Sequence, residues 1–237
     1  MDFIYQLLGS LLGIVYNFVN VYWLAIVIMT IIVKVALVPL SFKQIQSSKA
    51  MNDIQPKLKQ LQEKYKNDKE TLNVKMMELY KEHKINPLAG CLPLLIQFPI
   101  LIGLLGVFRE PAKWVFGSDV ALANEALSQG FFWVQNLAEV DSLANIFGST
   151  APEFLAGLPG ILPILAALTT YISMASMNGK QAQANQQMKT MQMVMPLMIL
   201  WFGSTMSAGL MIYWTVSNVF QMAQQYIIPM MTKEATE

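Results

Sequence analysis

The sequence predicts an all-α polytopic membrane protein, in which five transmembrane helices surround a hydrophilic groove. First, 54% of the 237 residues are hydrophobic, and the mean hydropathy is +0.42. Second, only 13% of the residues are charged, whereas soluble domains carry about 25%. Third, the charges gather in a few blocks that separate apolar runs, each near the roughly 20 residues that cross a bilayer as a helix.

Residues 1–19 are predicted to form an extracytoplasmic interfacial amphipathic helix. One helical stripe is apolar and the opposite side carries Gln6, Ser10, Gly13 and Asn17. This periodicity is typical of a helix that lies along a membrane surface. The apolar stripe consists of Ile4, Leu7, Leu8, Leu11, Ile14, Val15 and Phe18. No Lys or Arg precedes Lys34, so the segment lacks the basic start of a secretory signal peptide.

Five apolar runs are predicted to span the membrane. They are residues 20–42, 87–108, 155–177, 191–208 and 210–229. The prolines in these runs are compatible with spanning helices, because neighbouring helices can satisfy the freed carbonyls. The last two runs meet at Ala208 and Gly209, which predicts a tight hairpin there; one continuous helix would be far longer than a bilayer requires.

The connecting segments are predicted from their charge. Residues 43–86 form a charged helical hairpin, in which apolar residues recur at helical spacing from Ile54 to Tyr65 and from Leu72 to Tyr80. Asn67, followed by Glu70, resembles a capping box and places a turn near 66–69. The hairpin charges fit either a solvated face or a partner-binding surface. The other connections are an extracytoplasmic loop at 109–154, a cytoplasmic loop at 178–190 and a short cytoplasmic tail at 230–237.

The lysine distribution predicts the orientation. Almost all cations lie in the hairpin, the 178–190 loop and the tail, and short lysine-rich loops stay cytoplasmic. The opposite side carries Arg109 and Lys113 beside a larger number of carboxylates. We therefore expect a multi-pass protein with its N-terminus outside and its C-terminus inside.

Lys34 is the most informative residue. It lies inside an otherwise uncharged run from Val21 to Leu40, and an ionised Lys near the middle of a spanning helix costs about 2.5–3.5 kcal/mol. One interpretation is that its stem snorkels to the cytoplasmic headgroups. The other is that its ammonium lines a water-filled groove enclosed by protein. No Asp or Glu occurs in any predicted span, so only water and neutral dipoles can solvate it there.

Other polar residues in the spans extend this hypothesis. We select Thr30, Gln97, Tyr213, Trp214 and Asn218, together with Lys34, as candidate groove residues. Each uncharged one could instead form hydrogen bonds that hold packed helices together. The methionines Met188, Met191, Met193, Met195 and Met198 could accommodate varied apolar partners, but ordinary gap-filling is the simpler interpretation.

Several function classes find no support in the sequence. Cys91 is the single cysteine and His83 the single histidine, which makes a metal site unexpected, and no phosphate-binding loop of P-loop or dinucleotide type is present. No nucleophile, base and orienting group can be placed together, so we expect no enzyme and no cofactor. The net charge of +1 gives no basic field for direct nucleic-acid recognition.

Three segments of the chain resemble the YidC/Oxa/Alb family of membrane protein insertases. They are KVALVPLSFKQIQSSKAM, NPLAGCLPLLIQFPILIG and GLMIYWTVSNVFQMAQQYII, and the resemblance extends over about residues 3–229. It implies a five-helix core with a groove open to the cytoplasm and to lipid. In that family a groove cation on the first span is thought to attract acidic outer segments of substrates. Lys34 matches that position, where arginine is usual, and Thr30, Gln97 and Trp214 match other groove positions.

The resemblance also implies partners and location. We expect nascent membrane proteins and the lipid bilayer as partners, with the ribosome, targeting factors and the Sec translocon as further candidates. The expected location is the bacterial cytoplasmic membrane, with the protein acting as a monomer in the compact form of Gram-positive relatives. Two rival interpretations are a small anion-binding transporter or channel, although no inverted repeat is evident, and a purely structural membrane scaffold.

Overall fold

The computed structural model describes the backbone of residues 2–83, 85, 92–184 and 186–234, and side chains for the same residues except 92–95, 149, 177–188 and 229–234. Every regular element in these residues is helical, and three isolated β-bridges are the only extended pairings among them. The all-helical prediction is confirmed. The described residues leave out 86–91, at the end of the predicted hairpin and the start of the second predicted span, and 235–237 in the predicted tail.

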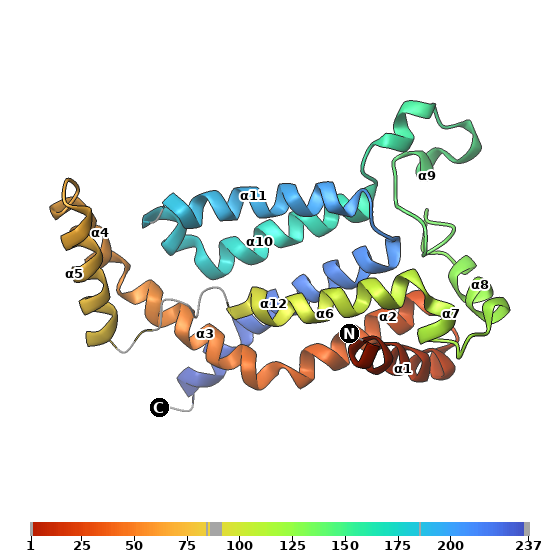
Figure 1. Ribbon diagram of the computed structural model, residues 1–237, viewed down its shortest axis with the longest axis horizontal. Coiled ribbons are helices and arrows are strands. Elements are labelled where there is room, and N and C mark those ends of the chain that lie inside the picture. Colours follow the sequence, from red (N-terminus) through yellow and green to blue (C-terminus); the bar gives the residue numbers. More distant parts are fainter. Residues whose placement is uncertain (1, 84, 86–91, 185, 235–237) are drawn as a thin grey trace.

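The long helices form an elongated bundle (Figure 1). Its members are α2 (Tyr22–Ala36), α3 (Val38–Asp53), α6 (Leu92–Arg109), α10 (Ile161–Ala184), α11 (Gln186–Gly203) and α12 (Ala208–Glu234). Helix α10 packs against both α11 and α12, and α12 also packs against α2. Buried residues from α2, α6, α10 and α12 share one hydrophobic core with residues of α1 (Asp2–Val19).

The run predicted as a single span at 20–42 contains a bend. Helix α2 ends at Ala36, α3 begins at Val38, and their axes differ by 64°. Pro39 explains the break, because it lacks an N–H and its ring disfavours a helical residue before it. Helix α3 therefore leaves the direction of α2 and packs against α10 and α12 before it reaches the charged hairpin.

The charged hairpin consists of α4 (Gln55–Lys64) and α5 (Lys69–Glu82), which lie side by side at one end of the bundle (Figure 1). A small core holds it together, built on Ile54, Leu58 and Leu79. The N-cap of α5 is Asp68 and not Asn67 as predicted: Asp68 Oδ1 accepts from Thr71 N at 3.0 Å, and Oδ2 accepts from the Thr71 hydroxyl at 2.6 Å. A carboxylate binds this pair of donors better than an amide does.

The opposite end of the bundle is covered by short helices. They are α7 (Pro111–Trp114), α8 (Val120–Ser128), α9 (Ala144–Phe147) and the 3₁₀ segments η2 (Gly148–Thr150) and η3 (Glu153–Gly157). Residues 204–207 connect α11 to α12, so the turn precedes Ala208 rather than lying at Ala208 and Gly209 as predicted. The backbone N–H groups of Ala208 and Gly209 instead donate to the carbonyls of Glu139 and Leu137, at 2.7 and 3.0 Å.

Helix α1 packs through its buried residues, which are Leu8, Gly9, Leu12, Gly13, Val15 and Tyr16. Leu8 and Val15 belong to the predicted apolar stripe, whereas Leu7, Ile14 and Phe18 of that stripe are exposed, as is Phe3. The glycines permit this contact: a Cβ on Gly13 would lie 2.6 Å from the carbonyl oxygen of Val115. The exposed apolar residues of α1 therefore face away from the bundle.

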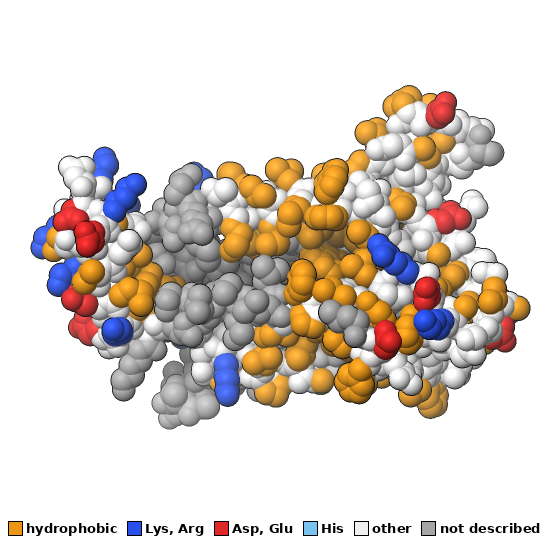
Figure 2. Space-filling view, in the orientation of Figure 1, with side chains coloured by type: hydrophobic (Ala, Val, Ile, Leu, Met, Phe, Trp, Pro, Cys, Tyr) orange, Lys and Arg blue, Asp and Glu red, His pale blue; other side chains and the backbone are white. Residues whose placement is uncertain are grey.

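In the space-filling view, apolar side chains cover much of the described surface between the two ends, and most charged side chains lie towards the ends (Figure 2). Judged by length and hydropathy, α1 is the single described helix that is able to cross a membrane unaided, and the bent α2–α3 pair would be a second crossing if it acts as one span. The described parts of α6 and α10 hold shorter apolar stretches, Ile96–Arg109 and Ile161–Ser176.

Candidate functional site

A cavity of about 170 Å³ lies inside the bundle, between residues of α2, α3, α6, α10, α11 and α12. Its lining mixes one cation, hydroxyls, carboxamides and methionines. The polar residues that line it are Lys34, Ser41, Gln44, Gln97, Thr170, Ser173, Trp214, Ser217, Asn218, Gln221, Gln224 and Gln225. Neither Asp nor Glu is present among these lining residues.

Lys34 supplies the only charge among the residues that line this cavity. It occupies the last turn of α2, just before the break at Leu37, and its side chain is only 9% exposed. A cation in this position also interacts favourably with the helix carbonyl end. Within the described part of the chain, no carboxylate lies within the 4.0 Å of an ion pair with it. Lys34 thus lies in a recess lined by both polar and apolar side chains, without a carboxylate partner among the described residues.

Gln97 contributes a carboxamide from α6. Its Nε2 donates to the Tyr213 hydroxyl at 2.8 Å, which fixes the orientation of the amide at the wall of the cavity. Tyr213 itself is 1% exposed and is not one of the lining residues, so its function here is to support Gln97 from within the core.

Trp214 and Asn218 follow each other by one turn on α12 and share a partner on α10. Trp214 Nε1 donates to Thr170 Oγ1 at 3.0 Å, and Asn218 Nδ2 donates to the same oxygen at 2.9 Å. Asn218 Nδ2 also lies 3.1 Å from Thr169 Oγ1. These bonds connect α10 to α12 along the cavity wall and leave both α12 side chains with satisfied donors.

The structure does not bring Thr30 to the cavity, contrary to the prediction. Thr30 is fully buried, and its hydroxyl donates to the Ile26 carbonyl at 2.6 Å. It lies one turn before Lys34, on the part of α2 whose Ile26 and Met29 belong to the hydrophobic core. Of the six selected residues, Lys34, Gln97, Trp214 and Asn218 therefore line the cavity, while Thr30 and Tyr213 pack behind it.

Sequence reasoning left several lining residues out of the candidate set. On α12 the lining residues recur at helical spacing, at positions 214, 217, 218, 221, 224 and 225, and this stripe is readable from the sequence. Thr170 and Ser173 form a similar pair on α10. Gln44 gave no such signal, because it lies within the segment that was assigned to the charged hairpin.

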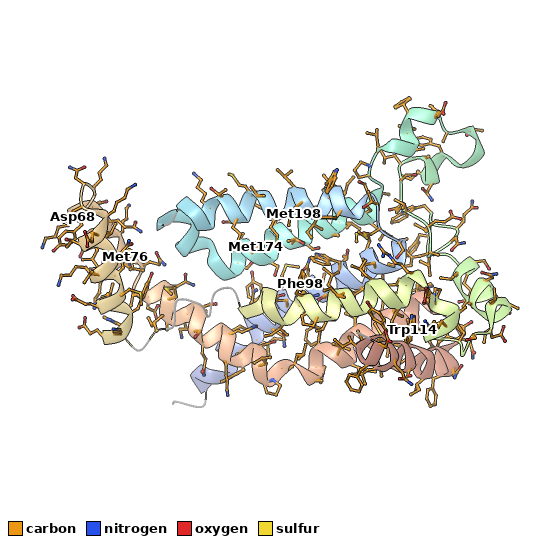
Figure 3. All side chains as sticks on the ribbon, in the orientation of Figure 1. Asp68, Met76, Phe98, Trp114, Met174 and Met198 are labelled. Carbon is orange, nitrogen blue, oxygen red and sulfur yellow. The ribbon has the colours of Figure 1, made fainter. Side chains whose placement is uncertain are left out.

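Three methionines complete the wall. Met174, Met191 and Met195 line the cavity, whereas Met193 and Met198 lie on the exposed side of α11; Met174 and Met198 are labelled in Figure 3. The side chain of Met188 lies outside the described residues. Unbranched thioethers can repack around apolar groups of different shape, so these residues give the cavity an adaptable side.

The loop before α10 is tied to the bundle at the end near α7 and α8 (Figure 1). Asp141 is fully buried, and its carboxylate accepts from Trp133 Nε1 at 3.0 Å and from Leu162 N at 2.7 Å. Burial raises the pKa of Asp141, and these two hydrogen bonds partly oppose that shift. Because Leu162 belongs to the first turn of α10, Asp141 ties the loop to the start of that helix. Val140 is also paired with Ser207, just before α12.

Among the described residues, no three His, Cys, Asp or Glu side chains come together as a metal site. The cavity offers hydrogen-bond donors, hydrogen-bond acceptors and one ammonium, but no nucleophile paired with a base. This arrangement is suited to transient binding of a polar group inside an apolar bundle.

Comparison with known proteins assigns this architecture. The model of the family described as the 60Kd inner membrane protein matches residues 14–235. The chain belongs to this family, the YidC/Oxa/Alb membrane protein insertases. The resemblance seen in the sequence is thereby confirmed, and the family is one of insertases rather than of enzymes.

Relatives of several sizes are similar to the chain. The membrane protein insertase YidC of Fusobacterium nucleatum is 37% identical over 232 residues, which cover 96% of this chain and 98% of that protein. The YidC of Clostridium acetobutylicum is 40% identical over 229 residues, with 94% and 81% covered. YidC 1 of Listeria monocytogenes serotype 4b is 36% identical over 211 residues, and the match spans 63% of its length.

A solved structure shares the fold. It is the crystal structure of an active YidC insertase with the first transmembrane domain resolved, and it superposes with a TM-score of 0.67 at 21% sequence identity. The match covers 95% of this chain and 46% of that one.

Proposed function

We propose that this protein is an insertase and chaperone that helps newly made proteins enter and fold in the bacterial cytoplasmic membrane. Its family and its relatives named as membrane protein insertases support this function. The observation that carries the mechanism is the buried Lys34 in a cavity that also holds hydroxyls and carboxamides, without a carboxylate partner among the described residues.

In the proposed mechanism, the groove shortens the stretch of hydrocarbon that a hydrophilic segment of the substrate must cross. Five spans enclose the groove: the segment 20–42, which includes the bend between α2 and α3, and helices α6, α10, α11 and α12. Hydration of the groove lowers the cost of moving a short hydrophilic segment into the bilayer, and Lys34 transiently compensates an acidic residue on that segment. The apolar band between two charged ends supports such an arrangement (Figure 2). Hydrophobic partitioning of the substrate helix into lipid then drives its release.

The orientation and partners follow from the same proposal. The α4–α5 hairpin faces the cytoplasm, where it receives the nascent chain, the ribosome, targeting factors or the Sec translocon. The loop secured by Asp141 faces outside and closes the groove there. Helix α1 lies along the outer interface, supported by its exposed Phe3, Leu7, Ile14 and Phe18 and by its contact with the C-terminal half of α6.

The test is complementation in cells depleted of their own insertase, with a small membrane substrate that has an acidic outer tail. Hydrogen bonds to charged groups contribute about 1.5–3 kcal/mol, so Lys34→Ala should reduce insertion roughly 10–100-fold and Lys34→Glu should reduce it further. Lys34→Arg should insert the substrate normally, because guanidinium keeps the charge. Lys49→Ala, on the exposed surface, is the matched control. Normal insertion by both Lys34→Ala and Lys34→Glu would show that the groove charge is not used.

A further inference from the structure

Carboxamides line the part of the cavity formed by α3 and the C-terminal half of α12. Gln44 comes from α3, and Gln221, Gln224 and Gln225 come from α12. Gln44 is 9% exposed and Gln224 is 7% exposed. Gln221 and Gln225 are partly buried, so four carboxamides share this part of the lining.

Three amide atoms in this cluster lack hydrogen-bond partners among the described residues. They are the donors Gln44 Nε2 and Gln224 Nε2 and the acceptor Gln225 Oε1. The second atom of the Gln225 amide, Nε2, is placed by Ser173, whose carbonyl lies 3.4 Å away. The other amides that line the cavity at Gln97 and Asn218 have partners, as described above. An unsatisfied buried polar group costs about 1–3 kcal/mol, so these atoms are expected to acquire partners during the working cycle.

The combination of donors and acceptor narrows the chemistry of that partner. A carboxylate would require donors alone and would be repelled by Gln225 Oε1. A cation would require acceptors alone and would be repelled by Lys34 and by the two amide N–H₂ groups. A peptide main chain presents both a C=O acceptor and an N–H donor in every residue, and it carries no net charge. The free atoms of the cluster match a peptide main chain.

The cluster fits an extended segment better than a helical one. A helix uses most of its own peptide N–H and C=O groups in internal hydrogen bonds, whereas an extended chain leaves them free to bond to the amides. Gln44 approaches from α3, on another wall of the same cavity, while Met174, Met191 and Met195 leave room for side chains of different shape.

We propose that Gln44, Gln224 and Gln225 form a main-chain binding site that holds an extended, polar segment of the inserting protein through its peptide groups. The inference rests on the proposed function and deepens it. Lys34 interacts with acidic side chains of the segment. The amides bind its peptide groups, whatever its side chains are. Polar tails without any acidic residue are therefore also substrates of the groove.

The experiment uses the full chain in lipid nanodiscs and photo-crosslinking to a synthetic probe. The probe is an apolar 20-residue helix that carries a neutral Gly/Ser/Thr tail with a photoreactive residue. A second probe carries Asp residues in the tail. A third is the neutral depsipeptide, in which esters replace the tail amides and thus remove N–H donors and weaken C=O acceptors.

The variant is Gln44→Met combined with Gln224→Met, which keeps the length of the side chains. Two lost hydrogen bonds should lower crosslinking of the neutral and acidic probes alike by about tenfold. The depsipeptide should crosslink to the wild-type protein as poorly as the neutral peptide crosslinks to the variant. Crosslinking of the depsipeptide should fall little further in the variant. Gln135→Met, at an exposed position outside the cavity, should crosslink like the wild type.

A stability measurement separates binding from folding. Replacing unsatisfied buried amides with apolar side chains should leave the melting temperature unchanged or raise it, even though crosslinking falls. Equal crosslinking of peptide and depsipeptide, or of variant and wild type, would overturn the inference. If no probe crosslinks to the wild type at all, the proposed function fails as well. If crosslinking depends on Lys34 but not on the glutamines, only the main-chain site is lost.

Discussion

Replacing Asp141 should loosen the outer end of the bundle. The buried carboxylate accepts from Trp133 Nε1 and from Leu162 N, at 3.0 and 2.7 Å, so Asp141→Ala leaves two buried donors without an acceptor. Two hydrogen bonds to an ionised acceptor contribute about 3–6 kcal/mol in total. Desolvation of the carboxylate, which raises its pKa, offsets part of this sum. The net loss should be about 2–4 kcal/mol, or roughly 4–16 °C in melting temperature for a chain of this length.

The assay is thermal unfolding in nanodiscs combined with amide hydrogen exchange at residues 137–142 and 160–164. Exchange should accelerate at both segments, because the loop and the start of α10 are tied to each other. Asp119→Ala is the matched control: Asp119 caps α8 through Leu122 N at 3.0 Å, but on an exposed surface, and its loss should cost about 1 kcal/mol. If the two variants were equally stable, the buried carboxylate would contribute nothing beyond an ordinary cap.

The same residue gives a pH dependence with a definite sign. A folded-state pKa above the unfolded value means that the folded protein binds the proton more tightly. The stability of the wild type, relative to the non-titrating Asp141→Asn variant, should therefore increase as the pH falls from 7 towards 4. Melting temperatures of both proteins over this range provide the check, and an advantage of the wild type that shrinks with acid would contradict the assignment.

Two further predictions concern the helices outside the groove. Gly13→Ala should weaken the packing of α1 against the bundle, because the added Cβ would lie 2.6 Å from the Val115 carbonyl oxygen. The expected result is faster amide hydrogen exchange along α1. Gly157→Ala is the control, because a Cβ at Gly157 meets open space. Asp68→Ala should fray the start of α5, because the N–H and hydroxyl of Thr71 lose the carboxylate oxygens that accept from them. In the wild type, these hydrogen bonds hold the pKa of Asp68 below its usual value. Amide hydrogen exchange at residues 69–72 measures this fraying, and unchanged protection in Asp68→Ala would refute the cap. In the wild type, protection of these amides should fall only as the pH drops through the lowered pKa of Asp68.

The sequence alone determined the helical class, the family and the presence of an isolated cation, Lys34, inside an apolar run. Apolar runs of bilayer length separated by charged blocks permit few structures other than helices in lipid, since every backbone polar group must be satisfied internally. The isolated cation was recognisable because a charge in such a run is costly. Trp214 and Asn218 were recognisable because polar residues on one face of an apolar helix mark an interior surface.

The tertiary structure decided which of these side chains share a space. Thr30 and Lys34 are one turn apart on α2, yet the core covers the first while the cavity receives the second. Gln44 lines the cavity because the chain bends by 64° at Leu37 and directs α3 against α10 and α12. The loop that carries Asp141 is tied to α10, more than 20 residues further along the chain, by a hydrogen bond that no local pattern encodes. Hydrophobic periodicity is a local property of a helix, whereas burial of a given side chain depends on which other helices pack against it.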